Sequence, residues 1–166
     1  MKEQFVKSCV GAIVEKEING EKYILMQTRQ KEDGGATNGL FELPAGKIRE
    51  YENIFDALRR EVWEETGLRI TKICGEEATV FSEVGNNTIL SFEPYCITQN
   101  LSGAYSIILH TFLCEAEGEL LASSDETQDI HWEKVTAIRE MVEKRPEKIF
   151  LMHVNALKKY VGENCY

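Results

Sequence analysis

The segment AGKIREYENIFDALRREVWEETGL, from Ala45 to Leu68, places three carboxylates near the end of a helix-like stretch. These are Glu61, Glu64 and Glu65. The C-terminal end of a helix carries partial negative charge, which disfavours acids there. Like charges four residues apart also repel, by about 0.2–0.5 kcal/mol. Because this placement costs stability, it predicts that a cation binds at these side chains.

Helical spacing puts Glu61 and Glu65 one turn apart on the same side, with Glu64 beside Glu65. Glu52 precedes the helix and can fold back towards them. Carboxylate oxygens suit hard cations, which favours Mg²⁺ or Mn²⁺. Protein-bound Mg²⁺ is usually shared with substrate phosphates. The alternative is a solvated acidic helix face, but it leaves the spacing of the whole segment unexplained.

The residues around these carboxylates fit the same interpretation. Arg60 precedes Glu64 by four residues, so the two can pair and hold the carboxylates in place. Gly46 lets backbone approach closely, and the Ala45 carbonyl can then face the metal.

A sheet and several helices must position this segment. Apolar patterning predicts strands at residues 5–14, 22–27, 68–84, 88–99, 104–115 and 129–132, with a short apolar piece at 40–43. A hairpin turn is expected at Asn19-Gly20, and loops at 29–38 and 45–51. Helices are expected at 53–66, at 134–143 and from Pro146 to Gly162. This order predicts one α/β domain over residues 1–166, with a mixed sheet covered by helices on both faces.

Composition excludes several classes of function. The net charge of −9 argues against a nucleic-acid binder, which needs a basic surface. No apolar run is long enough to span a bilayer, and the N-terminus does not read as a signal peptide. The five cysteines, at positions 9, 74, 96, 114 and 165, show no metal-binding spacing. Reduced, buried thiols in a cytoplasmic protein are therefore expected.

The acidic segment resembles a known motif. The segment matches all nine constrained positions of the Nudix box, G-x5-E-x7-R-E-U-x-E-E-x-G-U, in which U is an apolar residue. Gly46 and Glu52 occupy the first two positions, and REVWEETGL, from Arg60 to Leu68, supplies the rest. The resemblance implies an α/β/α sandwich with a central mixed sheet. It also implies a Mg²⁺-dependent hydrolase for a nucleoside diphosphate linked to another moiety, acting on a small-molecule nucleotide.

Roles follow from the resemblance by position. Glu61 and Glu65 would be the main metal ligands, with Glu64 ligating or supporting a second metal. The Ala45 carbonyl would complete a site, Arg60 would orient the glutamates, and Glu52 would fix the loop or help to position them.

The general base is expected from a loop beyond the box. The stretch SSDETQD, Ser123 to Asp129, offers Asp125, Glu126 and Asp129. We favour Glu126 as the base or as an extra metal ligand. The alternative is a solvated turn whose polar side chains make local caps.

The lead-in FELPAGKI, from Phe41 to Ile48, resembles that of ADP-ribose and other nucleotide-sugar pyrophosphatases. One departure is that the proline these enzymes usually carry about fifteen residues after the box is missing, since Glu83, Val84 and Gly85 stand there. The alternatives are a nucleoside triphosphate pyrophosphohydrolase and a non-catalytic nucleotide-binding sensor on the same fold.

Further residues complete the expected site and its surroundings. Arg29 and Glu42 are candidate substrate contacts, and an exposed loop arginine is the alternative for Arg29. Trp63 is expected to pack against the fold, and His110, His131 and His153 to be structural. A homodimer is one option, with the first strands or the final helix as the interface.

Overall fold

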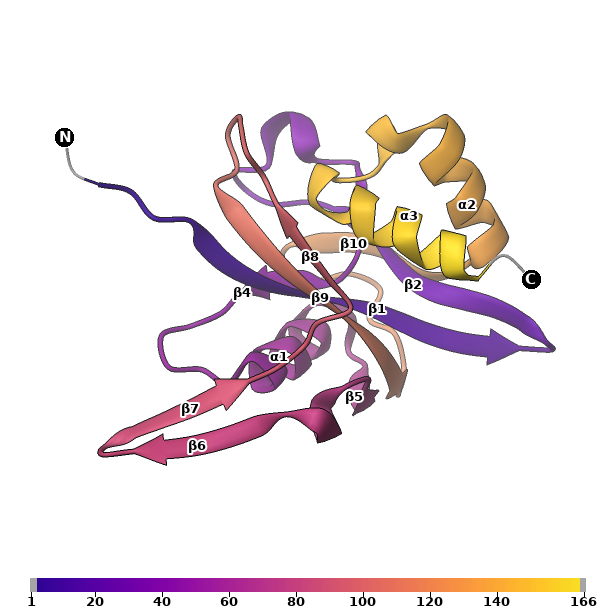
Figure 1. Ribbon diagram of the computed structural model, residues 1–166. Helices are drawn as coiled ribbons and strands as arrows, with labels where there is room; N and C mark the ends of the chain where they lie inside the picture. The colour runs from indigo at the N-terminus through magenta and orange to yellow at the C-terminus, as the bar shows by residue number, and fades with distance from the viewer. Residues whose placement is uncertain (1–2, 165–166) are drawn as a thin grey trace.

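The computed structural model describes residues 3–164 and is built around a mixed sheet (Figure 1). The strands along its main path are ordered β10-β2-β1-β9-β5, while β3 pairs with β2, β4 with β1 and β8 with β9. Only β1 and β9 run parallel among these pairs. The bounds are β1 (Lys7–Ile18), β2 (Glu21–Arg29), β3 (Phe41–Glu42), β4 (Ala45–Lys47), β5 (Arg69–Ile73), β8 (Cys96–Gln99), β9 (Ile107–Glu117) and β10 (Thr127–Lys134).

Helices cover both faces of this sheet (Figure 1). On one face, α1 (Ile54–Thr66) buries Leu58 and Val62 against a core that includes Phe112 of β9. On the other face, α2 (Val135–Lys144) and α3 (Val154–Glu163) form a second core with Ile13 of β1. Successive residues of a strand point to opposite faces, so β1 contributes to both cores. The α/β/α sandwich expected from the sequence is confirmed.

The helix that carries the glutamates begins and ends at residues suited to those positions. Asn53 caps its start, with the side-chain oxygen accepting from the Phe55 N–H at 2.9 Å. Gly67 ends it at a φ of 77°, a left-handed conformation that glycine adopts without a steric cost. The predicted helix is therefore confirmed to within one residue.

Three expected elements differ from the structure. The loop predicted at 45–51 begins with β4, which pairs with β1. The strands predicted at 68–84 and 88–99 are each divided into two shorter strands. The first is interrupted near Gly75, which has a φ of 87°, and the second is interrupted around Pro94. Their inner halves, β6 (Val80–Val84) and β7 (Asn87–Ser91), form a separate two-stranded sheet beside α1 (Figure 1).

The helix expected from Pro146 begins eight residues later. Two 3₁₀ turns, Pro146–Lys148 and Leu151–His153, come first. Between them the chain is extended, because Ile149 bridges to Phe41 and the Phe150 N–H donates to the Phe41 carbonyl at 2.8 Å. This detour brings Phe150 and His153 to the cavity described below. Within residues 3–164, no helix has the length and apolar character needed to cross a bilayer.

Candidate functional site

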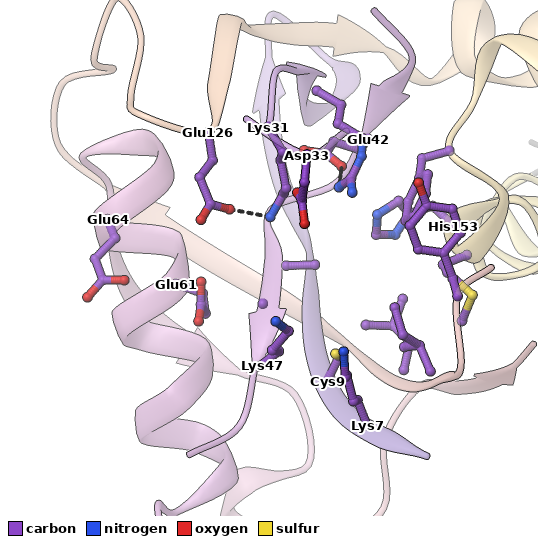
Figure 2. A pocket seen from close by; sticks show the side chains of 18 of the residues that line it. Lys7, Cys9, Lys31, Asp33, Glu42, Lys47, Glu61, Glu64, Glu126 and His153 are labelled. Atoms are coloured by element: carbon purple, nitrogen blue, oxygen red, sulfur yellow. Dashed lines mark hydrogen bonds and ion pairs between the residues drawn. The ribbon is translucent and has the colours of Figure 1, made fainter. Parts of the chain in front are cut away.

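A cavity of about 910 Å³ opens beside the C-terminal half of α1. Its walls come from α1, β4, the start of β1, the loop after β2 and the loop before β10, with Phe150 and His153 on the far side. Figure 2 shows Glu61 on the side of α1 towards Lys31 and Glu126, with Glu64 further out on the same helix. Most of the residues predicted for the site meet here.

Glu65 is the most deeply buried carboxylate of α1, only 3% exposed. Its Oε2 accepts from Gln27 Nε2 at 2.8 Å and from the Ala45 N–H at 3.1 Å. Its Oε1 has no hydrogen-bond partner in the described chain, and Lys31 Nζ lies 4.0 Å away. Burial, with the negative charge of Glu42 as a second cause, raises the pKa of Glu65 to about 8. A buried carboxylate oxygen without a partner marks a place where a cation fits.

Glu61 lies directly over Gly46. A Cβ added to Gly46 would be 2.0 Å from Glu61 Cδ, so only glycine leaves room for this carboxyl group. Burial raises the pKa of Glu61, although the neighbouring Arg60 opposes that rise. Glycine at the first position of the motif thus has a direct role in placing a predicted metal ligand.

Arg60 connects the acidic side chains. It donates to Glu52 at 2.7 and 2.9 Å, to Glu61 at 2.5 Å and to Glu64 at 3.3 Å. It also donates to the Lys47 carbonyl at 3.1 Å, which ties α1 to β4. The hydrogen bonds from Arg60 lower the pKa of Glu52 to about 2. Glu52 therefore touches Arg60, which suits a role in positioning Arg60 and the loop.

The two predicted substrate contacts form a buried ion pair at the cavity wall. Arg29 Nη1 lies 3.1 Å from Glu42 Oε2, and the guanidinium stacks over Phe150, 4.3 Å from the ring centroid. The alternative of an exposed loop arginine is wrong, because Arg29 is 8% exposed. Burial raises the pKa of Glu42, against the lowering effect of Arg29.

Glu126 contacts a residue that the sequence analysis missed. Lys31, in the loop after β2, donates to the Glu126 carboxylate across the cavity (Figure 2). Gln27, the donor to Glu65, was also missed. Gln27, Arg29 and Lys31 stand at alternate positions along β2 and its extension, so a period of two was the available signal.

Three other expectations can be compared with the structure. Trp63 is only partly packed, since its side chain is 54% exposed beside Arg69 and Ile70. His153 is buried, as a structural residue would be, and burial lowers its pKa to about 3. The cysteines at 9, 74, 96 and 114 are free, and Cys165 lies outside the described residues. The expectation of buried thiols holds for Cys9 and Cys114 and is wrong for Cys74, which is exposed.

The donor set suits a hard divalent cation. In the part of the chain that the structure describes, no three acidic, histidine or cysteine side chains are already gathered as a metal cage. The carboxylates instead contact Arg60, Gln27 and Lys31. However, Glu61 lines the cavity and the buried Glu65 Oε1 accepts no hydrogen bond, so both offer carboxylate oxygens as ligands. These residues therefore fit Mg²⁺ or Mn²⁺.

Comparisons with known proteins agree with this geometry. The family model for the NUDIX domain matches residues 7–152. Among solved structures, the MutT protein of Methanosarcina mazei Go1 is 20% identical, with 99% of each chain covered and a TM-score of 0.60. The NUDIX domain of Shewanella oneidensis NrtR, complexed with ADP ribose, is 16% identical, covering 100% of this chain and 91% of that one, with a TM-score of 0.67.

A Caenorhabditis elegans Ap4A hydrolase binary complex is 16% identical, with coverage of 96% and 98% and a TM-score of 0.55. No curated protein matches the sequence. The likeness to the solved structures concerns the fold, whereas the family match spans the sheet, α1 and the cavity. With the complete motif in place around Glu61 and Glu65, the chain belongs to the Nudix family of pyrophosphohydrolases.

Proposed function

We propose that this Nudix hydrolase uses Mg²⁺ or Mn²⁺ to cleave the pyrophosphate of nucleotide sugars, with ADP-ribose as a representative substrate. Two observations carry the proposal: the buried Oε1 of Glu65 accepts no hydrogen bond, and the Glu61 carboxyl lies over Gly46. The Lys31 ammonium is 4.0 Å from that Oε1, too far for a hydrogen bond, so a bound cation would offset the remaining cost of burying the carboxylate.

The residues have separate roles in this proposal. Glu61 and Glu65 hold the cation, with Glu64 and the Ala45 carbonyl as further oxygen donors. When bound, the cation neutralises charge on the phosphate oxygens, which is most of what phosphoryl transfer requires. Arg60 keeps Glu61 and Glu64 in place, since it contacts both. Glu126 accepts the proton of the attacking water, from its place on the cavity wall.

Two observations support a nucleotide sugar as the substrate. The lead-in from Phe41 to Ile48 resembles that of ADP-ribose and other nucleotide-sugar pyrophosphatases, and its Glu42 and Ala45 line the cavity. The NrtR domain with the same fold was solved with ADP ribose. A volume of about 910 Å³ is within the range of roughly 300–1,000 Å³ typical of small-molecule sites. We further propose one domain over residues 1–166 and a cytoplasmic location, which suits the free thiols.

The test is hydrolysis of a nucleotide panel with Mg²⁺ or Mn²⁺, with and without EDTA. The panel contains ADP-ribose, UDP-glucose, the common nucleoside triphosphates, Ap4A and NADH. Cleavage of nucleotide sugars that EDTA abolishes is the expected result. Preferred cleavage of nucleoside triphosphates would show that the substrates are triphosphates and not nucleotide sugars. Binding of nucleotides without turnover would support the sensor alternative. A second readout, the shift in melting temperature on adding Mg²⁺ alone, tests metal binding independently of activity.

A further inference from the structure

Two lysines enter the cavity without an acidic partner. Lys7 of β1 and Lys47 of β4 both line it, both are exposed, and neither ammonium makes an ion pair or hydrogen bond within residues 3–164. Lys31, the third lysine of the cavity, is bound to Glu126 instead.

The strand register places Lys7 and Lys47 together. Cys9 of β1 pairs with Lys47 of β4, so these side chains share one face of the sheet. Lys7 precedes Cys9 by two residues and therefore lies on that same face. Burial raises the pKa of the Cys9 thiol; Lys47, Lys31 and Lys7 oppose that rise, whereas Glu61 adds to it. The lysines thus converge around one point of the cavity wall.

Lys47 and Glu61 lie on opposite faces of β4, although both act electrostatically on Cys9. Gly46 and Lys47 are consecutive in β4, so their side-chain positions are on opposite faces of the strand. The Gly46 position faces Glu61, and Lys47 therefore points away from that carboxyl. Figure 2 shows Lys47 and Lys7 on the strands beside Cys9, with Glu61 and Glu64 on α1. One substrate that spans the cavity would meet both regions.

We propose that Lys7 and Lys47 bind a second anionic group, a phosphate or carboxylate carried by the part of the substrate beyond the scissile pyrophosphate. This inference rests on the proposed function and narrows it. The pyrophosphate is neutralised at α1, by the cation that Glu61 and Glu65 hold. A neutral sugar would leave these two exposed ammonium groups to water, whereas an acidic sugar would pair with both. The preferred substrates are then nucleotide sugars with an acidic sugar.

The experiment compares matched substrates that differ only in this group. UDP-glucose and UDP-glucuronic acid differ by a carboxylate, and ADP-ribose and ADP-ribose 1″-phosphate differ by a phosphate. The measured quantity is the ratio of kcat/KM for the acidic member to that for the neutral member. We expect a ratio of about ten or more for the wild type in at least one pair, since charged hydrogen bonds have this magnitude. If only the UDP-sugar pair shows this ratio, the lysines bind a carboxylate; if only the ADP-ribose pair shows it, they bind a phosphate.

The variants are Lys7→Gln, Lys47→Gln and the double variant. Each single change should lower the ratio, and the double variant should bring it close to one. Lys158→Gln, an exposed lysine of α3 outside the cavity, is the matched control and should keep the wild-type ratio. Increasing salt should lower the ratio for the wild type more than for the double variant.

Three outcomes would overturn the inference. One is a wild-type ratio near one in both pairs. Another is a high ratio that the double variant retains. The third is an equal fall of kcat/KM for both members of a pair, which would assign the lysines to the pyrophosphate itself. If no substrate is hydrolysed, the proposed function fails, and the same ratio taken from dissociation constants still tests Lys7 and Lys47.

Discussion

The Glu61 carboxyl group occupies the space that Gly46 leaves by having no side chain. A Cβ on Gly46 would lie 2.0 Å from Glu61 Cδ and 2.1 Å from its Oε2. Arg60 fixes the same carboxylate from the helix side, at 2.5 Å. The position of a predicted metal ligand is therefore set by a missing atom on β4 as well as by α1.

Gly46→Ala should lower kcat by about a hundredfold, because a misplacement of about 1 Å can cost this much. The added methyl group must push Glu61 away, whereas Gly46 itself does not need the left-handed backbone conformation. Steady-state kinetics measure the loss of rate, and circular dichroism on the same samples shows whether the variant is still folded. Gly162→Ala, in α3 with open space around it, is the matched control and should keep full activity. Unchanged turnover in Gly46→Ala would contradict the assignment of Glu61 as a metal ligand.

Glu65→Gln should lower turnover by orders of magnitude without lowering the melting temperature of the metal-free protein. The variant removes the charge that holds the cation. Without metal, the raised pKa of about 8 means that Glu65 is largely protonated at pH 7, so a neutral glutamine replaces it at little cost in stability. The measurements are kcat and the melting temperature in EDTA, with Glu143→Gln on the exposed face of α2 as control. A clear fall of the melting temperature would instead mark Glu65 as a structural residue.

The sequence predicted those parts of the site that depend on spacing within one element. Glu61, Glu64 and Glu65 follow from helical geometry, and the bounds of α1 follow from Asn53 and Gly67. Contacts between elements were not predictable in this way. Lys47 is next to Cys9 only because β4 forms and pairs with β1, and no local pattern marked residues 45–47 as a strand.

Arg29 shows the same limit for burial. A polar, glycine-rich stretch predicts an exposed loop, yet its first residue is covered because β3 places Glu42 opposite the guanidinium. Similarly, the helix expected from Pro146 was shortened because Ile149 bridges to Phe41. In both cases a distant strand determined the outcome, and the local propensity did not.

The Arg29–Glu42 ion pair is expected to contribute to the stability of the fold. Arg29→Met should lower the free energy of unfolding by about 3–5 kcal/mol, because it leaves Glu42 buried without its cation. Arg29→Met/Glu42→Gln should recover much of this loss. Urea unfolding of the two single variants and the double variant measures the coupling energy. Additive losses would show that the two residues are not coupled as the 3.1 Å contact indicates.

Glu126→Gln tests the proposed general base. Loss of a general base costs about 10²–10⁴ in rate, so kcat should fall within that range, and the acidic limb of the pH–rate profile should flatten. Asp125→Asn is the control, since Asp125 is the neighbouring acid of the same loop and also lines the cavity. A small effect on kcat with a raised KM would assign Glu126 to holding Lys31, its partner in the structure.

His153 should make the protein less stable in mild acid. Its side chain is 2% exposed, and its Nδ1 lacks a hydrogen-bond partner in the described residues. Burial, followed by the positive charges of Arg29 and Lys31, lowers its pKa to about 3. An unfolded histidine has a pKa near 6.5. Below pH 6.5 the unfolded chain therefore binds a proton that the folded chain does not, and stability falls as the pH drops from about 6.5 towards 3.

Between pH 7.5 and 5.0 this effect amounts to about 2 kcal/mol in the free energy of unfolding. His153→Leu cannot take up the proton, so its stability should fall less over that range than the stability of the wild type. Urea unfolding at both pH values measures the two differences, and His131→Gln on β10 serves as control. Equal pH dependence in the wild type and in His153→Leu would mean that the buried imidazole opens to water or is already protonated.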